Sequence, residues 1–434
     1  MDKMADVLGR AGAWCGQNKY LSAIKNAFQN FMPLTIAGAI GVLWCNVLVN
    51  DQTGLGLFFK PIMALDFLNP AFQAVNFCTI SCITVGITLG IAQEIGVWNM
   101  GAERAGYIPG LVGLAAWLSV TNTSHMVDGA KEAFTGVAGN ELGATGLFTG
   151  MIIGVLSVEL FCFFEKQDAL KIKMPEQVPP GVARAFEVLV PATITLIITA
   201  CIGSACYNLT GLYLNDVIKN GIQGPLGAVG ATIPGVMIIY LVIMLFWLVG
   251  IHGNNMLSAV KEALFTPLAL ENVEAFNKGE TPKNIINMYA LQMWGEFGGS
   301  GVTIGLVIAI MIFGKREDNK AIATLSLVPG LFNINETVTF GIPMVLNPIL
   351  GIPFVFACLV TILVGYVLTV IGFCPVACLT VPWTTPPIVF GFLACGANVM
   401  GAVTQAILIV VSTVIYTPFL IAYEKYQNKQ AAEV

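Results

Sequence analysis

The sequence predicts an all-α polytopic membrane protein with about ten transmembrane helices, two re-entrant hairpins and interfacial amphipathic helices. Three observations support this fold class: 56% of the 434 residues are hydrophobic, only 10% are charged, and the mean hydropathy is +0.80. Because soluble domains are about 25% charged, a water-soluble enzyme is excluded. The 20 Lys and Arg residues are outnumbered by 25 Asp and Glu residues, so no basic surface is available and no nucleic-acid partner is expected.

The predicted elements begin with an interfacial helix. Residues 4–15 place apolar side chains at helical spacing, and we expect residues 1–26 to lie as an amphipathic helix on the surface of the lipid bilayer. No cleavable signal peptide is expected, because the first long apolar run begins only after this stretch. Runs long enough to cross a bilayer, about 17–25 residues each, lie at 28–49, 72–92, 105–121, 143–164, 186–208, 228–250, 298–314, 350–373 and 400–422.

Two further apolar runs, 321–349 and 376–400, are interrupted by prolines and glycines. A broken helix leaves backbone groups without partners, and a bilayer cannot satisfy them. Such runs are therefore typical of broken or re-entrant helices that line a cavity or are covered by protein.

Basic residues predict the orientation, since they concentrate on the cytoplasmic side. They cluster before the first span, in the loop 165–184 and near the C-terminus, so we expect both termini in the cytoplasm and an even number of crossings. The rule fails between 251 and 320, where a re-entrant segment would restore it. The proline-rich loop predicts a boundary between an N-terminal membrane half (27–185, five spans) and a C-terminal membrane half (186–424), followed by a cytoplasmic tail (425–434).

Glu336 is the one charged residue between Lys320 and Glu424, and it lies in the segment Asn-Ile-Asn-Glu-Thr-Val-Thr, with Gly341 and Pro343 beyond it. Placing an ionisable group in a bilayer costs of order 3 kcal/mol, and such groups usually serve a function. We therefore expect a polar hairpin that lines a solute site. In the alternative, these polar side chains only satisfy backbone groups that the broken helix leaves free.

His252 and Glu296 are the next candidates. His252 ends an apolar run and is flanked by glycines, which allow a ligand or another backbone to approach closely. Its alternative role is that of a hydrogen-bonded structural histidine. Glu296 is the only charge between Lys283 and Lys315. It is a candidate ligand, and a gate, a hairpin tip or an interfacial acid are its alternatives.

Three tryptophans lie in or beside these polar segments. Sugars present an apolar C–H face that packs on aromatic rings, while their hydroxyls need hydrogen-bond donors and acceptors. The combination favours a neutral polyol as the solute, although Trp383 also fits an interfacial aromatic belt. The candidate substrate-binding residues are Trp247, Asn254, Trp294, Glu296, Gly299, Asn333, Asn335 and Trp383.

The sequence lacks the motifs of several kinds of functional site. No Gly-Lys-Ser/Thr phosphate loop occurs, so the chain is not expected to hydrolyse ATP by itself. The 11 cysteines lie mostly in apolar runs and are expected to be free thiols. The spaced pairs Cys78/Cys82 and Cys374/Cys378 lack a neighbouring His or acid, so no metal site and no cofactor are expected.

Several segments together resemble one known family. They are Met-Pro-Leu-Thr-Ile-Ala-Gly at 32–38, 174–183 with its Val-Pro-Pro-Gly-Val-Ala, Gly-Ile-His-Gly at 250–253, Gly-Leu-Phe-Asn-Ile-Asn-Glu at 330–336 with 340–343, Leu346-Asn347-Pro348, and Trp-Thr-Thr-Pro-Pro at 383–387. On these residues the chain resembles the membrane C component (EIIC) of the bacterial phosphoenolpyruvate-dependent sugar phosphotransferase system, in its lactose/cellobiose/diacetylchitobiose family. Thr337 departs from the family, which usually has proline after the acid.

The resemblance implies a homodimer in the bacterial plasma membrane, with dimer contacts mainly in the first half and the sugar site in the second. It implies a partner, the phosphorylated B component, whose phosphocysteine donates its phosphoryl group to the 6-hydroxyl of the bound sugar. Since the chain ends soon after the last span, we expect that B component to be a separate polypeptide. By motif, Glu336 and His252 would be the catalytic residues: Glu336 would bind the acceptor hydroxyl and serve as base, and His252 would hydrogen-bond the hydroxyl or the phosphoryl group.

Three functions remain open at this point. The leading one is phosphorylation-coupled uptake of a β-linked disaccharide of the cellobiose, diacetylchitobiose or lactose type. The second is a proton-coupled or facilitative secondary sugar carrier, in which Glu336 or His252 responds to a proton gradient. The third is a sugar sensor or scaffold that does not transport. The sequence does not name the sugar or the resting state of the site.

Overall fold

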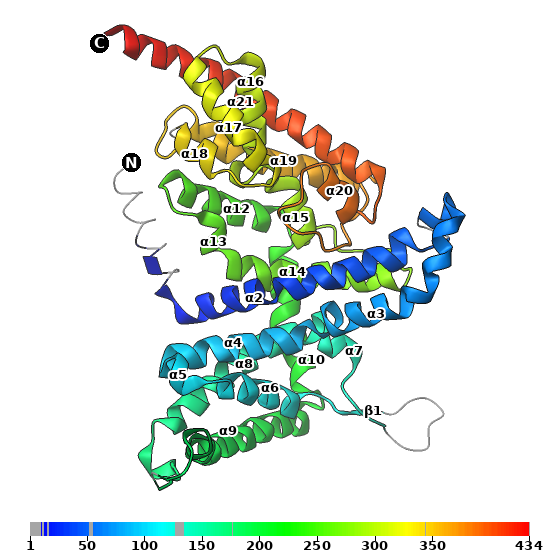
Figure 1. The fold of residues 1–434 in the computed structure, drawn as a ribbon, viewed down its shortest axis with the longest axis vertical. Helices are drawn as coiled ribbons and strands as arrows, with labels where there is room; N and C mark the ends of the chain where they lie inside the picture. The colour runs from blue at the N-terminus through cyan, green and yellow to red at the C-terminus, as the bar shows by residue number, and fades with distance from the viewer. Residues whose placement is uncertain are drawn as a thin grey trace. The chain divides into compact units, whose positions relative to one another are not determined.

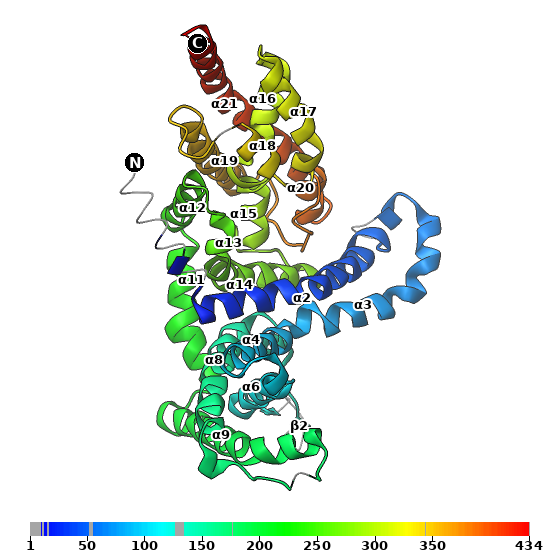
Figure 2. The same ribbon diagram turned by 60° about the vertical axis from the view of Figure 1, so that its left-hand side comes forward.

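The fold is almost entirely helical, as predicted (Figures 1 and 2). The computed structural model describes residues 10, 13–14, 17–51, 55–125, 134–175, 177–342 and 344–433. Within them the only sheet is a two-residue antiparallel pair, β1 (Ser124–His125) and β2 (Phe134–Thr135). Most of the interfacial helix predicted at 4–15 lies outside the described residues, as does Pro343 of the predicted hairpin.

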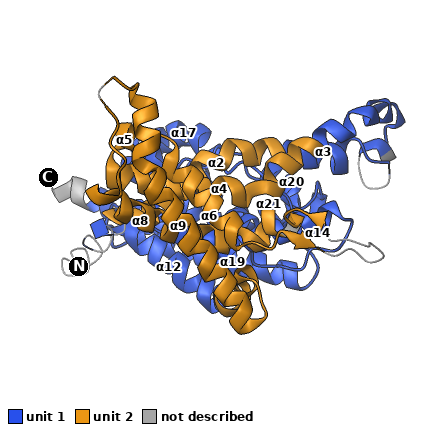
Figure 3. Ribbon diagram, turned by 90° about the horizontal axis from the view of Figure 1, so that it is seen from below, with its two compact units in different colours: residues 1–16, 39–73, 229–434 blue, residues 17–38, 74–228 orange. Residues whose placement is uncertain are grey.

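The chain divides into two compact units, coloured separately in Figure 3. Unit 1 comprises 1–16, 39–73 and 229–434, and unit 2 comprises 17–38 and 74–228. This division differs from the boundary expected after residue 185, because α9 (Pro180–Thr210) runs through that position and packs on α6 and α8 of unit 2. The assignment of two membrane halves therefore stays a prediction.

Unit 2 is built around four apolar helices: α4 (Ile83–Met100), α6 (Ile108–Val120), α8 (Ala144–Glu165) and α9. Glycines let the helices approach closely: a Cβ on Gly154 of α8 would lie only 3.1 Å from the carbonyl oxygen of Thr88 on α4. Trp117 of α6 fills the core between them. The shorter elements of the region are η4 (Ile80–Cys82), α5 (Ala102–Ala105), α7 (Gly139–Leu142), η5 (Asp168–Leu170), α10 (Leu214–Ile218), η6 (Lys219–Gln223) and α11 (Gly224–Gly230).

An ion-pair network closes one end of unit 2. Arg104 and Arg184 both contact Glu165 and Glu187, with N···O distances of 2.8–2.9 Å. These residues come from α5, α8 and α9, so the network joins three helices at the beginning and end of the loop 166–179.

Unit 1 holds the long α19 (Gly351–Val370) and α21 (Val399–Glu433), with several broken helices around them. α2 (Lys19–Leu43) and α3 (Asn69–Cys78) each pass from one unit into the other, and η1 (Trp44–Leu48), η2 (Leu55–Leu57) and η3 (Lys60–Leu68) lie between them. The remaining helices of unit 1 are α12 (Ile233–Leu248), α13 (Gly253–Met256), α14 (Ser258–Asn277), α15 (Met288–Gly295), η7 (Ser300–Val302), α16 (Ile304–Phe313), α17 (Glu317–Leu331), α18 (Glu336–Gly341) and α20 (Val389–Ala394).

Each of the nine predicted spans corresponds largely to helix. Six helices of the described residues are long and apolar enough to cross a membrane, and α15 with η7 and α16 forms a seventh candidate that is bent by 59°. The predicted spans 105–121 and 228–250 are the shorter helices α6 and α12. Both interrupted runs are broken, since 332–335 and 371–388 are not helical. The second break contains Pro382, Pro386 and Pro387, whereas Pro329 and Gly330 lie inside α17, just before the first break. Ten crossings and two re-entrant hairpins stay predictions.

Candidate functional site

His252 and Glu336 face each other across a short gap in unit 1. His252 is the N-cap of α13, where its Nδ1 accepts a hydrogen bond from the backbone N–H of Asn255 at 3.2 Å. Because Nδ1 is an acceptor, the proton of a neutral ring lies on Nε2. His252 Nε2 lies 3.8 Å from Oε1 of Glu336, the first residue of α18. Their side chains are 38% and 46% exposed, so both are accessible.

The turn after α12 places this histidine. Gly250 has φ = +80°, a backbone conformation that side chains disfavour. The turn lets the ring of His252 pack on Trp247, with ring centroids 4.5 Å apart. Trp247 is buried at 2% exposure and meets Phe354 of α19 edge to face. The tryptophan therefore supports the histidine from within the protein core.

Glu296 lies in a buried polar cluster. It accepts a hydrogen bond from the hydroxyl of Tyr240 at 2.7 Å and forms an ion pair with Lys261. The Lys261 ammonium also donates to Oδ1 of Asn254 at 3.1 Å, and the amide of Asn254 donates to Oγ of Ser300 at 2.9 Å. Lys261 is only 7% exposed in its side chain. A buried ion pair with this many hydrogen bonds holds α12, α13, α14 and the segment after α15 together.

The two asparagines of the predicted hairpin bond to the protein itself. Asn333 accepts from the backbone N–H of Gly298 at 2.7 Å, and its amide donates to the carbonyls of Trp383 and Thr385. Asn335 is buried and donates to the carbonyl of Ser300 and to the Thr339 hydroxyl. These side chains thus fix the polar segment against its neighbours.

The tryptophans and Gly299 occupy different surroundings. Trp294 is 1% exposed and packs on α19, where a Cβ on Gly365 would lie 2.8 Å from its indole nitrogen. Trp383 is 45% exposed. Gly299 has φ = +85°, and a Cβ there would lie 2.6 Å from the Cβ of Asn335. The sugar contacts of all these residues stay predictions. Trp383 is the tryptophan best placed to contact a sugar, because its side chain is the most exposed of the three.

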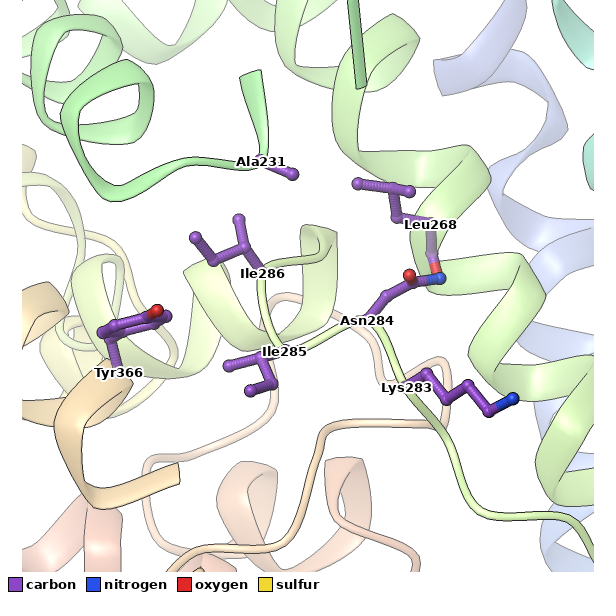
Figure 4. A pocket seen from close by; sticks show the side chains of 7 residues that line it. All are labelled: Ala231, Leu268, Lys283, Asn284, Ile285, Ile286 and Tyr366. Carbon is purple, nitrogen blue, oxygen red and sulfur yellow. The ribbon is translucent and has the colours of Figure 1, made fainter. Parts of the chain in front are cut away.

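A cavity elsewhere in unit 1 does not include the predicted site residues. Figure 4 shows it between the start of α12, α14, the segment 283–286 and Tyr366 of α19. Its volume is about 230 Å³, below the roughly 300–1,000 Å³ of typical ligand pockets. Its lining residues are Ala231, Leu268, Lys283, Asn284, Ile285, Ile286 and Tyr366.

Sequence reasoning missed three residues of the polar cluster: Lys261, Tyr240 and Ser300. In the sequence Lys261 is one of the basic residues between 251 and 320 that bear only on the orientation. Its spacing of seven residues from Asn254 is a weak signal for a shared helix face. Tyr240 lies inside an apolar run, and nothing in the sequence pairs it with Glu296.

Comparisons with known proteins agree with this architecture. A family model described as "Phosphotransferase system, EIIC" matches residues 25–358. The oligo-beta-mannoside-specific EIIC component of Bacillus subtilis (strain 168) is 33% identical and covers 98% of this chain and 94% of its own length. The cellobiose-specific EIIC component of Lactococcus lactis subsp. lactis (strain IL1403) is 29% identical and covers 98% of both chains.

A solved structure also matches. The crystal structure of the transporter ChbC, the IIC component from the N,N'-diacetylchitobiose-specific phosphotransferase system, has a TM-score of 0.88 at 30% sequence identity. The match covers 97% of each chain.

Proposed function

The chain belongs to the phosphotransferase system EIIC family, and on that premise we propose that it is a sugar permease for a β-linked disaccharide of the cellobiose, diacetylchitobiose or lactose type. It binds the sugar, carries it inward across the bacterial cell membrane, and presents the 6-hydroxyl for phosphorylation by a phosphocysteine B component. The named relatives support this substrate class, because oligo-beta-mannoside, cellobiose and N,N'-diacetylchitobiose are all β-linked sugars.

The observation that carries the proposal is the gap between His252 and Glu336. At 3.8 Å the two groups are too far apart for a direct hydrogen bond. A hydroxyl oxygen that lies beside the line joining the two atoms, about 2.8 Å from each, can bridge them. That hydroxyl donates its proton to the carboxylate and accepts from the Nε2–H of the histidine.

This geometry fits phosphoryl transfer. The attacking oxygen must lose a proton as the bond to phosphorus forms, and a carboxylate within hydrogen-bonding distance can accept it. We assign that role to Glu336. His252 has a single N–H to donate, at Nε2, and it donates this either to the same oxygen or to the incoming phosphoryl group. Most of the remaining rate acceleration comes from positioning the reacting groups, as in other phosphoryl transfers. The phosphoryl group itself comes from the B component, which docks on the cytoplasmic side; as the bond from the sugar oxygen to phosphorus forms, the bond between phosphorus and the cysteine sulfur breaks and the thiolate leaves.

Uptake into vesicles tests the proposal. Labelled cellobiose, diacetylchitobiose, lactose and glucose are supplied with and without the phosphodonor chain, and the product is analysed for phosphate. We expect one phosphorylated disaccharide that appears only with the donor. Accumulation of unmodified sugar without the donor, abolished by an uncoupler, would instead establish a proton-coupled carrier. Sugar binding without any translocation would favour the sensor instead.

The Glu336→Gln variant separates the transfer chemistry from sugar binding. The amide still accepts one hydrogen bond but cannot take the proton, so we expect the phosphorylation rate to fall by about 10²–10⁴. Sugar affinity, measured without donor, changes much less. A variant that phosphorylates sugar at the wild-type rate would remove the base role and leave the permease intact.

A further inference from the structure

We propose that Ser300 is a positioning residue that sets the distance between His252 and Glu336. This inference rests on the proposed function, and it assigns to one buried serine, through its hydroxyl and its backbone carbonyl, the alignment of the two groups that hold the acceptor hydroxyl. Ser300 contacts neither group directly. It bonds instead to the residues that fix each of them.

One side of Ser300 holds the histidine segment. Its Oγ accepts a hydrogen bond of 2.9 Å from the amide of Asn254, two residues after His252 on the same short helix. Lys261 donates to the carbonyl oxygen of that amide at 3.1 Å. The lysine therefore fixes which end of the amide faces Ser300. A helix of four residues has little stability of its own, so these external bonds locate His252.

The other side of Ser300 holds the glutamate segment. Its carbonyl oxygen accepts a hydrogen bond of 2.9 Å from the side chain of Asn335. Asn335 is the N-cap residue of α18 and immediately precedes Glu336. Asn335 is 3% exposed, so this contact lies in the protein interior. One residue thus bridges the supports of both groups.

The turn around Ser300 is shaped for this bridge. Gly299 and Gly301, on either side of Ser300, have φ angles of +85° and +78°, a backbone conformation that side chains disfavour. Gly299 leaves room for Asn335 to pack on the turn. The Tyr416 hydroxyl donates to the carbonyl of Gly301 at 2.8 Å and anchors the turn to α21. Ser300 itself is 5% exposed, which argues against direct contact with sugar.

The Ser300→Ala variant tests the inference in the full chain, reconstituted in lipid with the phosphorylated B component. Loss of the Oγ bond frees Asn254 and lets His252 move relative to Glu336. We expect the single-turnover phosphorylation rate to fall about tenfold, while the Kd for the sugar, measured without donor, stays within about twofold. The control is Ser326→Ala, which removes another buried hydroxyl, one that donates to the Ile322 carbonyl within its own helix α17. The control is expected to keep the wild-type rate.

A double-mutant cycle measures the coupling between Ser300 and Asn254, so the test does not depend on a single variant. Asn254→Ala breaks the same bond from the other end, so we expect the Ser300→Ala/Asn254→Ala pair to be no slower than the slower single variant. Ser300→Cys keeps the volume but is a weak acceptor, and it replaces the alanine variant if that protein does not accumulate.

Three results would overturn the inference: a Ser300 variant with a wild-type rate, a loss confined to sugar affinity, or rate losses that multiply in the double variant. A wild-type protein that produces no sugar phosphate would instead refute the proposed function, so the two failures are distinguishable.

Discussion

The buried ion pair between Lys261 and Glu296 makes a sharp stability prediction. The Lys261→Met variant keeps an unbranched side chain of similar length but removes the ammonium. Glu296, whose side chain is 18% exposed, then keeps the hydroxyl of Tyr240 and loses its counter-charge. Breaking one partner of a buried pair costs about 3–5 kcal/mol, because the remaining charge is left uncompensated.

The expected size of the effect follows from the length of the chain. One kcal/mol shifts the Tm of a 150–250-residue domain by about 2–4 °C, and by less in a larger protein. We therefore expect Lys261→Met to lower the Tm by roughly 5 °C. In the double variant Lys261→Met/Glu296→Gln, the amide is neutral and still bonds to Tyr240. This variant should recover at least half of the loss.

Thermal unfolding of the purified protein in detergent measures these shifts. The matched control is Lys278→Met, which breaks a pair with Glu274 on the surface, where the two side chains are 58% and 43% exposed. Exposed pairs of this kind contribute little, so the control should melt with the wild type. The reasoning is refuted if Lys261→Met melts at the wild-type temperature, or if the double variant is as unstable as the single one.

Three further predictions concern the sugar site and the C-terminal helix. Trp383→Ala should raise the Kd for sugar about tenfold without a change in Tm, because the ring is exposed and loses only stacking; an unchanged Kd in a titration would remove it from the site. Gly299→Ala should lower both Tm and phosphorylation rate, since its φ of +85° and a Cβ 2.6 Å from that of Asn335 both oppose a side chain; a wild-type melting curve would contradict this. Glu424→Gln should lower the Tm by a few degrees, because the carboxylate accepts the backbone N–H of Lys315 at 2.8 Å; sugar affinity should not change, and a large rise in Kd would show a role beyond structure.

The positions of most of the long helices could be predicted from the sequence. The predicted spans 143–164 and 350–373 correspond to α8 and α19, because a long apolar run without proline in its centre has few alternatives in a membrane. The sequence also predicts a break in 321–349, but not its position, because Pro329 lies inside α17 and the break falls on the following polar segment 332–335.

The partners of the polar residues were not predictable to the same degree. Lys261 and Glu296 are 35 residues apart and meet only because α14 and α15 fold back on each other. Trp294 and Trp383 are equally conspicuous in the sequence, yet one is 1% and the other 45% exposed. The sequence identifies an aromatic residue in a broken run, whereas its burial depends on the helix that packs on it.

The hydrogen bonds of the candidate site separate its polar residues into two roles. Glu296 and the three asparagines bond to other parts of the protein, and together they define the frame of the site. The side chains of His252 and Glu336 are 38% and 46% exposed, and within the described part of the chain no bond joins Nε2 of the one or the carboxylate of the other to that frame. In an apolar surrounding an unsatisfied polar group is costly, so polar groups that are left accessible are the ones a polar ligand can use. On the proposed function, recognition of the acceptor hydroxyl therefore rests on these two side chains, and on the proposed role of Ser300 their separation depends on the bonds of the frame.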